Sequence, residues 1–409
     1  MDKQTNKTPL VRFPEFKDDW KHKQLNKLLS VSKTTNKDLK YGKEEVLSVS
    51  GESGIVNQIE HLGRSYAGVS VHNYGVVELN QIVYTKSPLK ANPFGIIKLN
   101  KRKVGIVSTL YAVYNVNQET DGQFIEYYFS LDANLNRYLR PLVRKGAKNT
   151  LQVTDEEAIK GKLPFPQLPE QKKIAHFFSI VDQKINQLQE KLNGLELYKK
   201  GMMQQIFSQK LRFKPAQSEV EGDYNGQDFP DWEVKNLGEV CEINMGQSPN
   251  SSSYNTQEIG KYLIQGNADI FDRKTKPRNW TSEPTKFCEI DDIIMTVRAP
   301  VGAIARSSHN ACIGRGVCSI KNNSNNNLDF IYQILLNYEN KWDSLAQGST
   351  FTAVSGKDIR DLKFNFPSLN EQTKIANFLS KIDDKINAVN AQIEITKTYK
   401  KGLLQKMFV

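Results

Sequence analysis

The sequence contains few cysteines and no long apolar run. The four cysteines all lie in the second half of the chain, and none stands in a Cys-x-x-Cys pair; they are Cys241, Cys288, Cys312 and Cys318. A zinc site normally shows tighter pairing with histidines, so we expect reduced, packed thiols. No apolar segment is long enough to span a bilayer. A signal peptide has an apolar stretch behind its charged start, and the opening MDKQTNKTPLVRFPEF lacks one. We therefore expect a soluble protein of the cytoplasm.

Motifs for catalysis are also scarce. NPF at Asn92–Phe94 lacks the second proline of the NPPY/F motif of amino-methyltransferases, and no glycine-rich turn for the cofactor accompanies it. PDWEVK at Pro230–Lys235 has the letters of a PD…ExK nuclease site, but its two acids lie two residues apart rather than on separate strand positions. The five histidines are scattered, and there is no P-loop. We predict no catalytic centre and no metal site in this chain, and we assign any ATP-driven work to a partner.

Basic residues, by contrast, are in excess. The chain has 56 lysines and arginines against 45 aspartates and glutamates, a formal net charge of +11. Excess positive charge attracts polyanions such as nucleic acids, although many basic proteins bind none. With 409 residues, 38% of them hydrophobic and 25% charged, the chain is typical of a folded protein with two to four domains.

The most informative feature is an internal repeat. EQKKIAHFFSIVDQKI at Glu170–Ile185 returns 201 residues later as EQTKIANFLSKIDDKI at Glu371–Ile386. Around these stretches, residues 165–207 align with residues 366–408 without a gap, at 20 identities in 43 positions. Such self-similarity indicates two copies of one structural unit.

The repeat extends upstream with fewer identities. IVYTKSP at Ile82–Pro88 matches IMTVRAP at Ile294–Pro300, and the segment that begins at Phe124 matches the one that begins at Phe330. The offset between the copies shrinks along the chain, so the first copy carries extra residues. We predict a tandem duplication in which a variable globe and a near-invariant helix alternate twice.

Each near-invariant segment has the pattern of a coiled-coil helix. Its apolar residues alternate at spacings of four and three over more than four heptads, interrupted at Lys199 in the first copy. No proline interrupts either run, whereas Pro169 stands at the start of the first helix and Pro215 just past its end. The predicted core of the helix pair consists of Ile174, Phe178, Val181, Ile185, Leu188, Leu192, Leu195, Ile375, Leu379, Ile382, Ile386, Val389 and Ile393.

The two apolar stripes are natural partners, because neither can be buried alone. A helix over residues 170–208 would be about 58 Å long, and the polar connector at 209–228 spans only about 65 Å when fully stretched. We therefore predict an antiparallel pair, related by a pseudo-twofold axis, with the globes at opposite ends. The alternative is two unconnected amphipathic helices, each packed on its own globe. The predicted domains are a first globe at 1–163, a central helix at 164–212, a second globe at 213–365 and a C-terminal helix at 366–409.

The globes read as mixed α+β domains in which short strands, such as those in GVVELNQIVYTKSP and DDIIMTVRAP, alternate with turns and one helix. In the first globe the predicted helix is GQFIEYYFSLDANLNRYLRPLV at Gly122–Val143. Basic and polar residues gather in the loops RKGAKNTLQ, DRKTKPRNW and AQGSTFTA, and Lys86 and Arg298 share one repeat position before a proline. Arginine and lysine suit phosphates and guanine edges, and glutamine and asparagine suit adenine. A solvated surface role is the alternative for each residue. The candidate DNA-binding residues are Lys86, Arg144, Lys145, Lys148, Asn149, Gln152, Arg273, Lys274, Lys276, Arg278, Arg298, Arg315, Gln347, Ser349, Thr350 and Thr352.

Several of these stretches carry a family resemblance. FPSLNEQTKIANFLSKIDDKI, the preceding GSTFTAVSGKDIRDLKF, and VRAPVG…IGRG resemble the DNA-specificity subunit of type I restriction–modification enzymes. The resemblance covers essentially the whole chain and is specific in its architecture of two target-recognition domains and two conserved helical regions. The first globe departs from the pattern with KSPLK…VST, which suggests a different half-site and leaves its DNA contacts less defined.

The resemblance implies a non-catalytic, sequence-specific adaptor. Each globe would read one half of a bipartite site in double-stranded DNA, and the helix pair would set the gap and dock two methyltransferase subunits. S-adenosylmethionine, ATP and Mg would belong to partner subunits, among them a translocating restriction subunit, and this chain would hold no cofactor. Two other readings remain open: a self-contained methyltransferase or nuclease, and a coiled-coil scaffold whose globes bind proteins.

Overall fold

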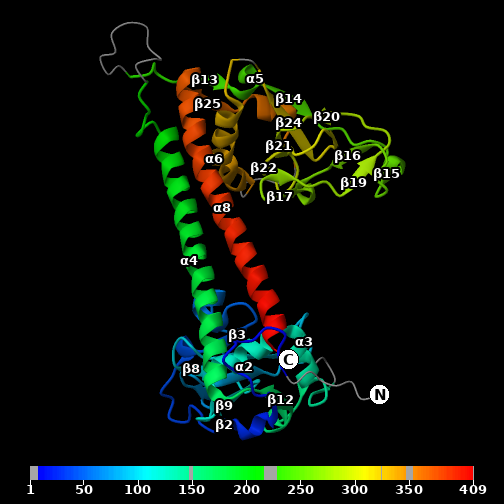
Figure 1. The fold of residues 1–409 in the computed structure, drawn as a ribbon. Helices are drawn as coiled ribbons and strands as arrows, with labels where there is room; N and C mark the ends of the chain where they lie inside the picture. Colours follow the sequence, from blue (N-terminus) through cyan, green and yellow to red (C-terminus); the bar gives the residue numbers. More distant parts are fainter. Residues whose placement is uncertain (1–7, 147–150, 216–227, 324, 347–352, 409) are drawn as a thin grey trace. The chain divides into compact units, whose positions relative to one another are not determined.

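The computed structural model describes residues 8–146, 151–215, 228–323, 325–346 and 353–408 (Figure 1). The chain forms two compact units, and each contains one globe with parts of both long helices. Unit 1 joins residues 1–189 to residues 391–409, and unit 2 consists of residues 190–390. The long helices, α4 (Leu168–Phe207) and α8 (Leu369–Met407), therefore each contribute one half to each unit.

The globe of unit 1 is built around a four-stranded antiparallel sheet in the order β2-β9-β6-β7. Two-stranded ladders join β1 to β12, β3 to β4, β5 to β8 and β10 to β11. The strands are β1 (Lys21–Gln24), β2 (Leu29–Val31), β3 (Leu47–Ser50), β4 (Gly54–Asn57), β5 (Gly75–Val77), β6 (Ile82–Thr85), β7 (Ile96–Leu99), β8 (Gly105–Val107), β9 (Tyr111–Val116), β10 (Arg144–Lys145), β11 (Leu151–Gln152) and β12 (Lys162–Phe165). The short helices are α1 (Gln58–Leu62), α2 (Gly122–Phe129) and α3 (Asp132–Leu139).

The globe of unit 2 has two larger sheets, in the orders β14-β24-β21-β22-β18-β17 and β15-β19-β16-β23-β20, and a β13-β25 ladder. Helix α6 lies alongside α8 (Figure 1). The strands are β13 (Glu233–Asn236), β14 (Cys241–Met245), β15 (Tyr254–Asn255), β16 (Lys261–Ile264), β17 (Ile270–Phe271), β18 (Lys274–Thr275), β19 (Asn279–Thr281), β20 (Phe287–Cys288), β21 (Ile293–Thr296), β22 (Ile304–Arg306), β23 (Ala311–Ile313), β24 (Val317–Asn322) and β25 (Lys363–Phe366). The helices are α5 (Leu237–Val240), α6 (Leu328–Ala346) and α7 (Gly356–Arg360).

The helix of the first globe differs from the sequence-based prediction. One helix was expected from Gly122 to Val143, but α2 and α3 are separate because the backbone becomes extended at Leu131. The Ser130 hydroxyl donates to the Tyr127 carbonyl at 2.7 Å and satisfies an acceptor of the last turn of α2. The break lets the buried residues Leu135 and Leu139 of α3 pack into the same core as α2.

The repeated Glu-Gln dipeptide joins each globe to its long helix. The Glu170 carboxylate is 1% exposed and accepts hydrogen bonds from Arg12 Nε at 2.7 Å, Arg12 Nη2 at 2.8 Å and Trp20 Nε1 at 3.2 Å. In unit 2 the fully buried Glu371 accepts from Arg212 Nε at 3.2 Å, Arg212 Nη2 at 2.8 Å and Trp232 Nε1 at 3.1 Å. A carboxylate removed from water needs such a cation and donors, so the motif is structural in both copies.

The following glutamine ties the long helix to the start of the globe helix. Gln171 Oε1 accepts from the backbone N–H of Asp121, the residue that caps α2, at 3.0 Å. In the second copy, Gln372 Oε1 accepts from the backbone N–H of Asn327, just before α6, at 2.9 Å. Each amide nitrogen also donates to the carbonyl of the proline five residues before it. These bonds fix the angle at which the globe helix meets the long helix.

A second repeated contact joins the two long helices within each unit. Lys400 Nζ of α8 lies 2.5 Å from Asp182 Oδ1 of α4 in unit 1, and Tyr127 of α2 donates to the other carboxylate oxygen at 2.8 Å. In unit 2, Lys199 Nζ of α4 lies 2.6 Å from Asp383 Oδ1 of α8. The Lys199 that interrupts the apolar stripe is therefore a partner in a part-buried ion pair. Within unit 1, Phe178 contacts Phe408 and Asp182 contacts Lys400, so residue numbers rise along one helix as they fall along the other, and the pairing is antiparallel.

The segment that follows α4 in unit 2 has a counterpart in unit 1, near the start of the chain. After α4, the Leu211 N–H donates to the Gln205 carbonyl at 3.1 Å. At the end of α8, the Val11 N–H donates to the carbonyl of Lys406, the repeat equivalent of Gln205, at 3.0 Å. The chain start therefore takes, in unit 1, the place that the connector takes in unit 2.

The predicted fold class is confirmed: two mixed α/β globes alternate with two long helices, whose halves pack antiparallel within each unit. The alternative of two separate helices, each packed only on its own globe, is wrong, because the core of unit 1 contains residues of both long helices. Phe408, which directly follows α8, stacks on Phe178 of α4 at 6.1 Å between ring centroids. The four-segment domain division remains a prediction.

Candidate nucleic-acid interface

In the second globe, two of the predicted cations lie opposite each other at the end of adjacent strands. The β21–β24 register pairs Thr296 with Val317, and the Val297 N–H donates to the Gly316 carbonyl at 2.9 Å. This register places Arg298 across from Arg315, and both side chains are exposed. Arg298 also forms a backbone bridge with Ala353, which follows the predicted loop at 347–352. The sheet thus brings two arginines and Ala353 to one edge.

Glycines allow three loops to pack against one another at this edge. A Cβ added to Gly316 would lie 2.0 Å from the Gln265 carbonyl oxygen, and one added to Gly246 would lie 2.2 Å from the Gly314 carbonyl oxygen. No side chain fits at either position. The close approach places Gln265 and the exposed Gln247 near Arg315. Sequence reasoning missed both glutamines, although each adjoins a glycine in the stretches GQS and QGN.

Arg278 joins this group through a buried carboxylate. Asp269, 3% exposed, accepts from the Gln265 N–H at 2.8 Å and from Arg278 Nε at 3.2 Å. The Arg278 side chain remains 63% exposed, so it can still meet a phosphate or a base edge. Lys274 and Lys276 are exposed on and after β18, and Lys276 Nζ lies over the Phe271 ring. Arg273 is engaged elsewhere: its guanidinium lies 2.6 Å from Glu339 of α6.

In the first globe, the predicted cations gather around a short hairpin. Arg144 pairs with Gln152 in the β10–β11 ladder, and these two side chains and that of Lys145 are exposed. Lys145 Nζ lies 5.7 Å from the centroid of the Phe94 ring. Lys86 Nζ lies 2.8 Å from Asp155, which follows the hairpin in the chain. The β10–β11 hairpin and Lys86 thus form one basic edge. Because Lys86 is the repeat equivalent of Arg298, this edge corresponds to the Arg298 edge of the second globe.

The two edges differ in how available their central cation is. Lys86 is half-buried and ion-paired with Asp155, whereas Arg298 is exposed. A phosphate would compete with a carboxylate for Lys86 and with water for Arg298. Six predicted contacts lie outside the described residues: Lys148, Asn149, Gln347, Ser349, Thr350 and Thr352.

The motifs that resembled catalytic sites have structural partners. Asn92 is buried, and its amide donates to Asp132 at 2.9 Å. Asp231 and Glu233 lie near Arg212 and Lys235, at 3.8 and 2.8 Å. All four cysteines are free and buried, and burial raises the pKa of Cys241 and of Cys318 to about 12. Across the described ranges, no group of three or more His, Cys, Asp or Glu side chains could hold a metal ion.

A family model decides what kind of protein this geometry belongs to. The model for the type I restriction modification DNA specificity domain matches residues 17–197 and again residues 230–397. The chain belongs to this type I specificity family. The two matches correspond to the two copies of globe and helix.

Individual relatives agree with this assignment. The chain is 32% identical over 316 residues to a protein described as the type I restriction enzyme MjaX specificity subunit of Methanocaldococcus jannaschii, which covers 76% of this chain and 68% of that protein. The S subunit of a type I restriction–modification system from M. genitalium matches 98% of this chain and 99% of its own at a TM-score of 0.63 and 16% identity. A chain from a study of complex assembly and conformational transition of the type I R-M system matches 95% of this chain and 96% of its own length, at a TM-score of 0.57 and 22% identity. The two structures share the fold of this specificity subunit.

The residues predicted for the core of the helix pair are withdrawn from solvent to different degrees. None of the thirteen predicted core residues is exposed; Val181, Ile185, Leu195 and Ile386 are half-buried and the others are buried. Near the C-terminal end of each long helix, Met203 and Leu404 are buried, whereas the preceding Met202 and Leu403 are half-buried. Where it is described, the chain has no helix with the length and apolar character needed to cross a membrane.

Proposed function

We propose that this chain is the non-catalytic, sequence-specific DNA-binding subunit of a type I restriction–modification enzyme. Each globe reads one half of a bipartite site in double-stranded DNA, and the helix pair sets the spacing between the halves. Methyltransferase subunits, two per chain, and restriction subunits supply the chemistry, together with S-adenosylmethionine, ATP and Mg. The observation that carries the proposal is the contrast within the repeat: the junctions of helix and globe are the same in both units, whereas the loops of the globes differ.

The basic edges support the DNA-reading role. In unit 2, Arg278, Arg298 and Arg315 lie with Gln247 and Gln265 around one set of loops, and such residues serve phosphates, guanine edges and adenine edges. In unit 1, the basic hairpin and Lys86 occupy the equivalent place with different residues. Different side chains on equivalent edges are what two unlike half-sites require.

Methylome sequencing tests the proposal. We expect a host that carries this chain and its cognate methyltransferase to show one bipartite methylated motif that is absent without the chain. Replacing Arg298 or Lys86 by alanine weakens methylation, and exchanging one globe changes one half of the motif only. A continuous motif, or methylation that persists without the chain, contradicts the proposal. Either result favours the alternative of a coiled-coil scaffold whose globes bind proteins.

A further inference from the structure

Unit 1 contains a hollow of about 650 Å³ where the turn before β6 and the end of β9 meet the start of α2. The hollow lies at the opposite end of β6 from Lys86 and is therefore separate from the basic edge. The described residues that line it include two carboxylates, Glu78 and Asp121, and no lysine or arginine. In a chain with a net charge of +11, this hollow is a local site of negative charge, which attracts cations.

Two polar groups of the hollow have no partner within the described residues. The Thr120 side chain is 7% exposed, and its hydroxyl forms no hydrogen bond. The exposed Glu78 carboxylate forms no hydrogen bond and no ion pair. A buried hydroxyl without a partner costs free energy, because it has lost its hydrogen bonds to water. Both groups are therefore acceptors for a ligand that carries hydrogen-bond donors.

The turn before β6 recurs in unit 2. Asn80 and Asp291 both have a positive φ, of 63° and 69°. The N–H of each donates at 2.8 Å to the carbonyl of the residue that directly follows the neighbouring strand, β7 in unit 1 and β22 in unit 2. By these contacts Asn80 is the counterpart of Asp291. Leu99, the last residue of β7, is likewise the counterpart of Arg306, the last residue of β22.

The start of the globe helix also recurs. Asp121 before α2 and Asn327 before α6 each accept, at 3.0 Å, from the backbone N–H three residues further on. Both side chains thus cap their helices in the same way. The first two helical positions are therefore equivalent, as the pairs Gly122 with Leu328 and Gln123 with Asp329.

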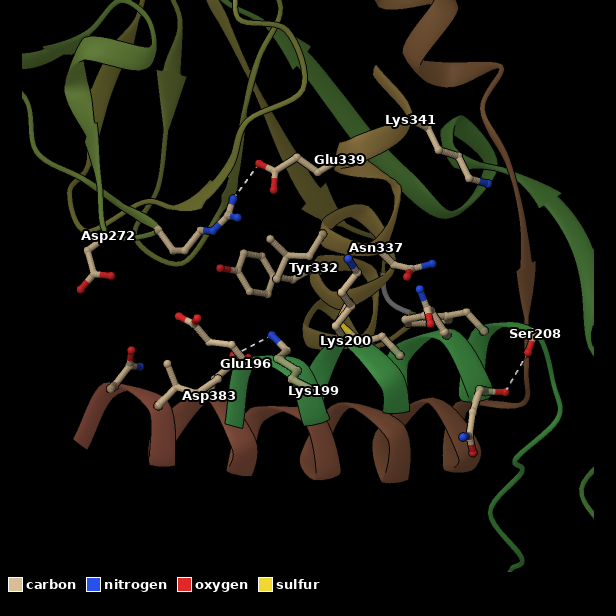
Figure 2. Close-up of a pocket in the computed structure, with 18 of the residues that line it drawn as sticks. Glu196, Lys199, Lys200, Ser208, Asp272, Tyr332, Asn337, Glu339, Lys341 and Asp383 are labelled. Atoms are coloured by element: carbon tan, nitrogen blue, oxygen red, sulfur yellow. Dashed lines mark hydrogen bonds and ion pairs between the residues drawn. The ribbon is translucent and has the colours of Figure 1, made fainter. Parts of the chain in front are cut away.

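In unit 2, the guanidinium of Arg306 joins the turn to the helix start. Its Nη1 donates to the Asp291 carbonyl at 2.8 Å. Its Nη2 donates to the Leu328 carbonyl at 3.3 Å and lies 2.5 Å from the Asp329 carboxylate. The guanidinium carbon lies 4.6 Å from the centroid of the Tyr332 ring, which is labelled in Figure 2. In unit 1 the counterparts of the three hydrogen-bonded positions all line the hollow; they are Asn80, Gly122 and Gln123.

Unit 1 has a leucine where unit 2 has this arginine. The Leu99 side chain is 4% exposed and belongs to the core. A Cβ added to Gly122 would lie 2.8 Å from Leu99 Cδ1, so the leucine packs directly against the start of α2. Unit 1 therefore keeps the backbone frame that holds a guanidinium in unit 2, but the equivalent residue supplies no cation.

A hollow of about 1260 Å³ in unit 2 has a different balance of charge (Figure 2). Two of its carboxylates are neutralised within the chain: Asp383 lies 2.6 Å from Lys199, and Glu339 lies 2.6 Å from Arg273. A charged ligand would have to displace these partners. The Glu78 carboxylate of unit 1 has no such partner within the described residues, so it is open to a cation from outside.

We infer that the hollow of unit 1 binds a guanidinium group from outside the chain, in the position that Arg306 occupies in unit 2. A guanidinium stays charged and presents five N–H donors in a planar fork, so it can reach several acceptors at once. Its source is either an arginine side chain of another protein or a small guanidinium compound. The site does not depend on DNA recognition, since it lies away from the basic edge of its unit.

The experiment titrates the purified full-length chain with two probes and follows binding by ligand-observed NMR. The probes are N-acetyl-argininamide and N-acetyl-lysinamide, which carry a guanidinium and an ammonium. We expect saturable binding of the arginine probe that is roughly fivefold or more tighter than that of the lysine probe. Equal affinities of the two probes, or no saturable binding of either, would overturn the inference.

Two variants locate the site. Glu78→Gln removes the unpaired carboxylate and should weaken binding of the arginine probe roughly fivefold or more. Thr120→Val removes the hydroxyl at nearly constant volume and should weaken binding about twofold to fivefold. Because neither group has a partner within the described residues, both variants should unfold at the same temperature as the unaltered chain.

The matched control is Glu119→Gln, which neutralises an exposed carboxylate next to Thr120 that is not among the residues lining the hollow. It should bind the arginine probe as the unaltered chain does. Unchanged binding by both site variants, or an equal loss in the control, contradicts the site.

A third variant tests the correspondence with unit 2. Adding Arg306→Leu to Glu78→Gln makes the start of α6 resemble that of α2 and should restore binding of the arginine probe. If this double variant is folded and binds no probe, the assignment to the Arg306 position is wrong.

Methylguanidinium distinguishes the two sources of the ligand. Binding as tight as that of the arginine probe supports a small guanidinium compound. Binding that is roughly fivefold or more weaker supports an arginine side chain of a protein, whose main chain then adds contacts of its own.

Discussion

The junctions and the loop edges of the two units have diverged to very different degrees. At the junctions, a buried glutamate binds an arginine and a tryptophan, and a lysine–aspartate pair joins the long helices, with the same residue types in both units. At the edges, a lysine paired with Asp155 in one unit stands where an exposed arginine stands in the other. Buried polar networks permit few alternatives, because each partner must be satisfied, whereas exposed loops can change.

Removing the buried glutamates gives the largest expected effect. Glu170→Ala leaves Arg12 and Trp20 without their acceptor and should reduce the free energy of unfolding by about 3–5 kcal/mol. Glu371→Ala should cost a similar amount, because its contacts are the same. Urea denaturation of both variants, with the exposed Glu190→Ala as control, measures this equivalence. A large difference between the two would mean that the junctions are alike in geometry only.

Exchanging the charges of one lysine–aspartate pair tests the antiparallel contact. Lys199→Asp places two carboxylates together and should cost about 1.5–3 kcal/mol, the range of a hydrogen bond to a charged group. Adding Asp383→Lys should recover most of the loss. A double-mutant cycle by denaturation provides the coupling energy, and the cycle at Lys400 and Asp182 should return a similar value. Additive losses would show that the pair contributes no coupling.

Gly316→Ala tests the packing of the loops at the Arg298 edge. The new Cβ would overlap the Gln265 carbonyl, so we expect a stability loss of about 1–2 kcal/mol from overpacking, together with weaker DNA binding by the assembled enzyme. Gly266→Ala is the matched control, since no heavy atom lies within 4 Å of the Cβ position there. Equal behaviour of the two variants in thermal unfolding would contradict the close approach.

The smallest effect should distinguish the two central cations. Arg298→Ala should weaken DNA binding by the assembled enzyme by about 1 kcal/mol, roughly fivefold, and lower the salt dependence by about one phosphate contact. Lys86→Ala should cost less, because Asp155 already holds that ammonium. Asp155→Asn should strengthen binding by releasing Lys86. Fluorescence anisotropy over a range of salt concentrations measures all three, and equal losses at Lys86 and Arg298 would remove the distinction.

The duplication, the two long helices and the family could all be predicted from the sequence alone. Heptad spacing and internal identity are local properties of the chain, so they survive without coordinates. Short strands such as β6 and β21 were also predicted, because their apolar runs are bounded by turn residues. The single predicted helix over α2 and α3 was wrong, since its break depends on how Leu135 and Leu139 reach the core.

Which polar residues meet could not be predicted without the folded chain. Arg12 and Glu170 are 158 residues apart, and Asp182 and Lys400 are 218 apart, so no local pattern announces either contact. The same holds for the Arg298 edge, where strand register and close glycine packing bring Gln265 and Arg315 together. Polar contacts at long sequence separation depend on the path of the whole chain, whereas apolar periodicity is imposed residue by residue on one helix.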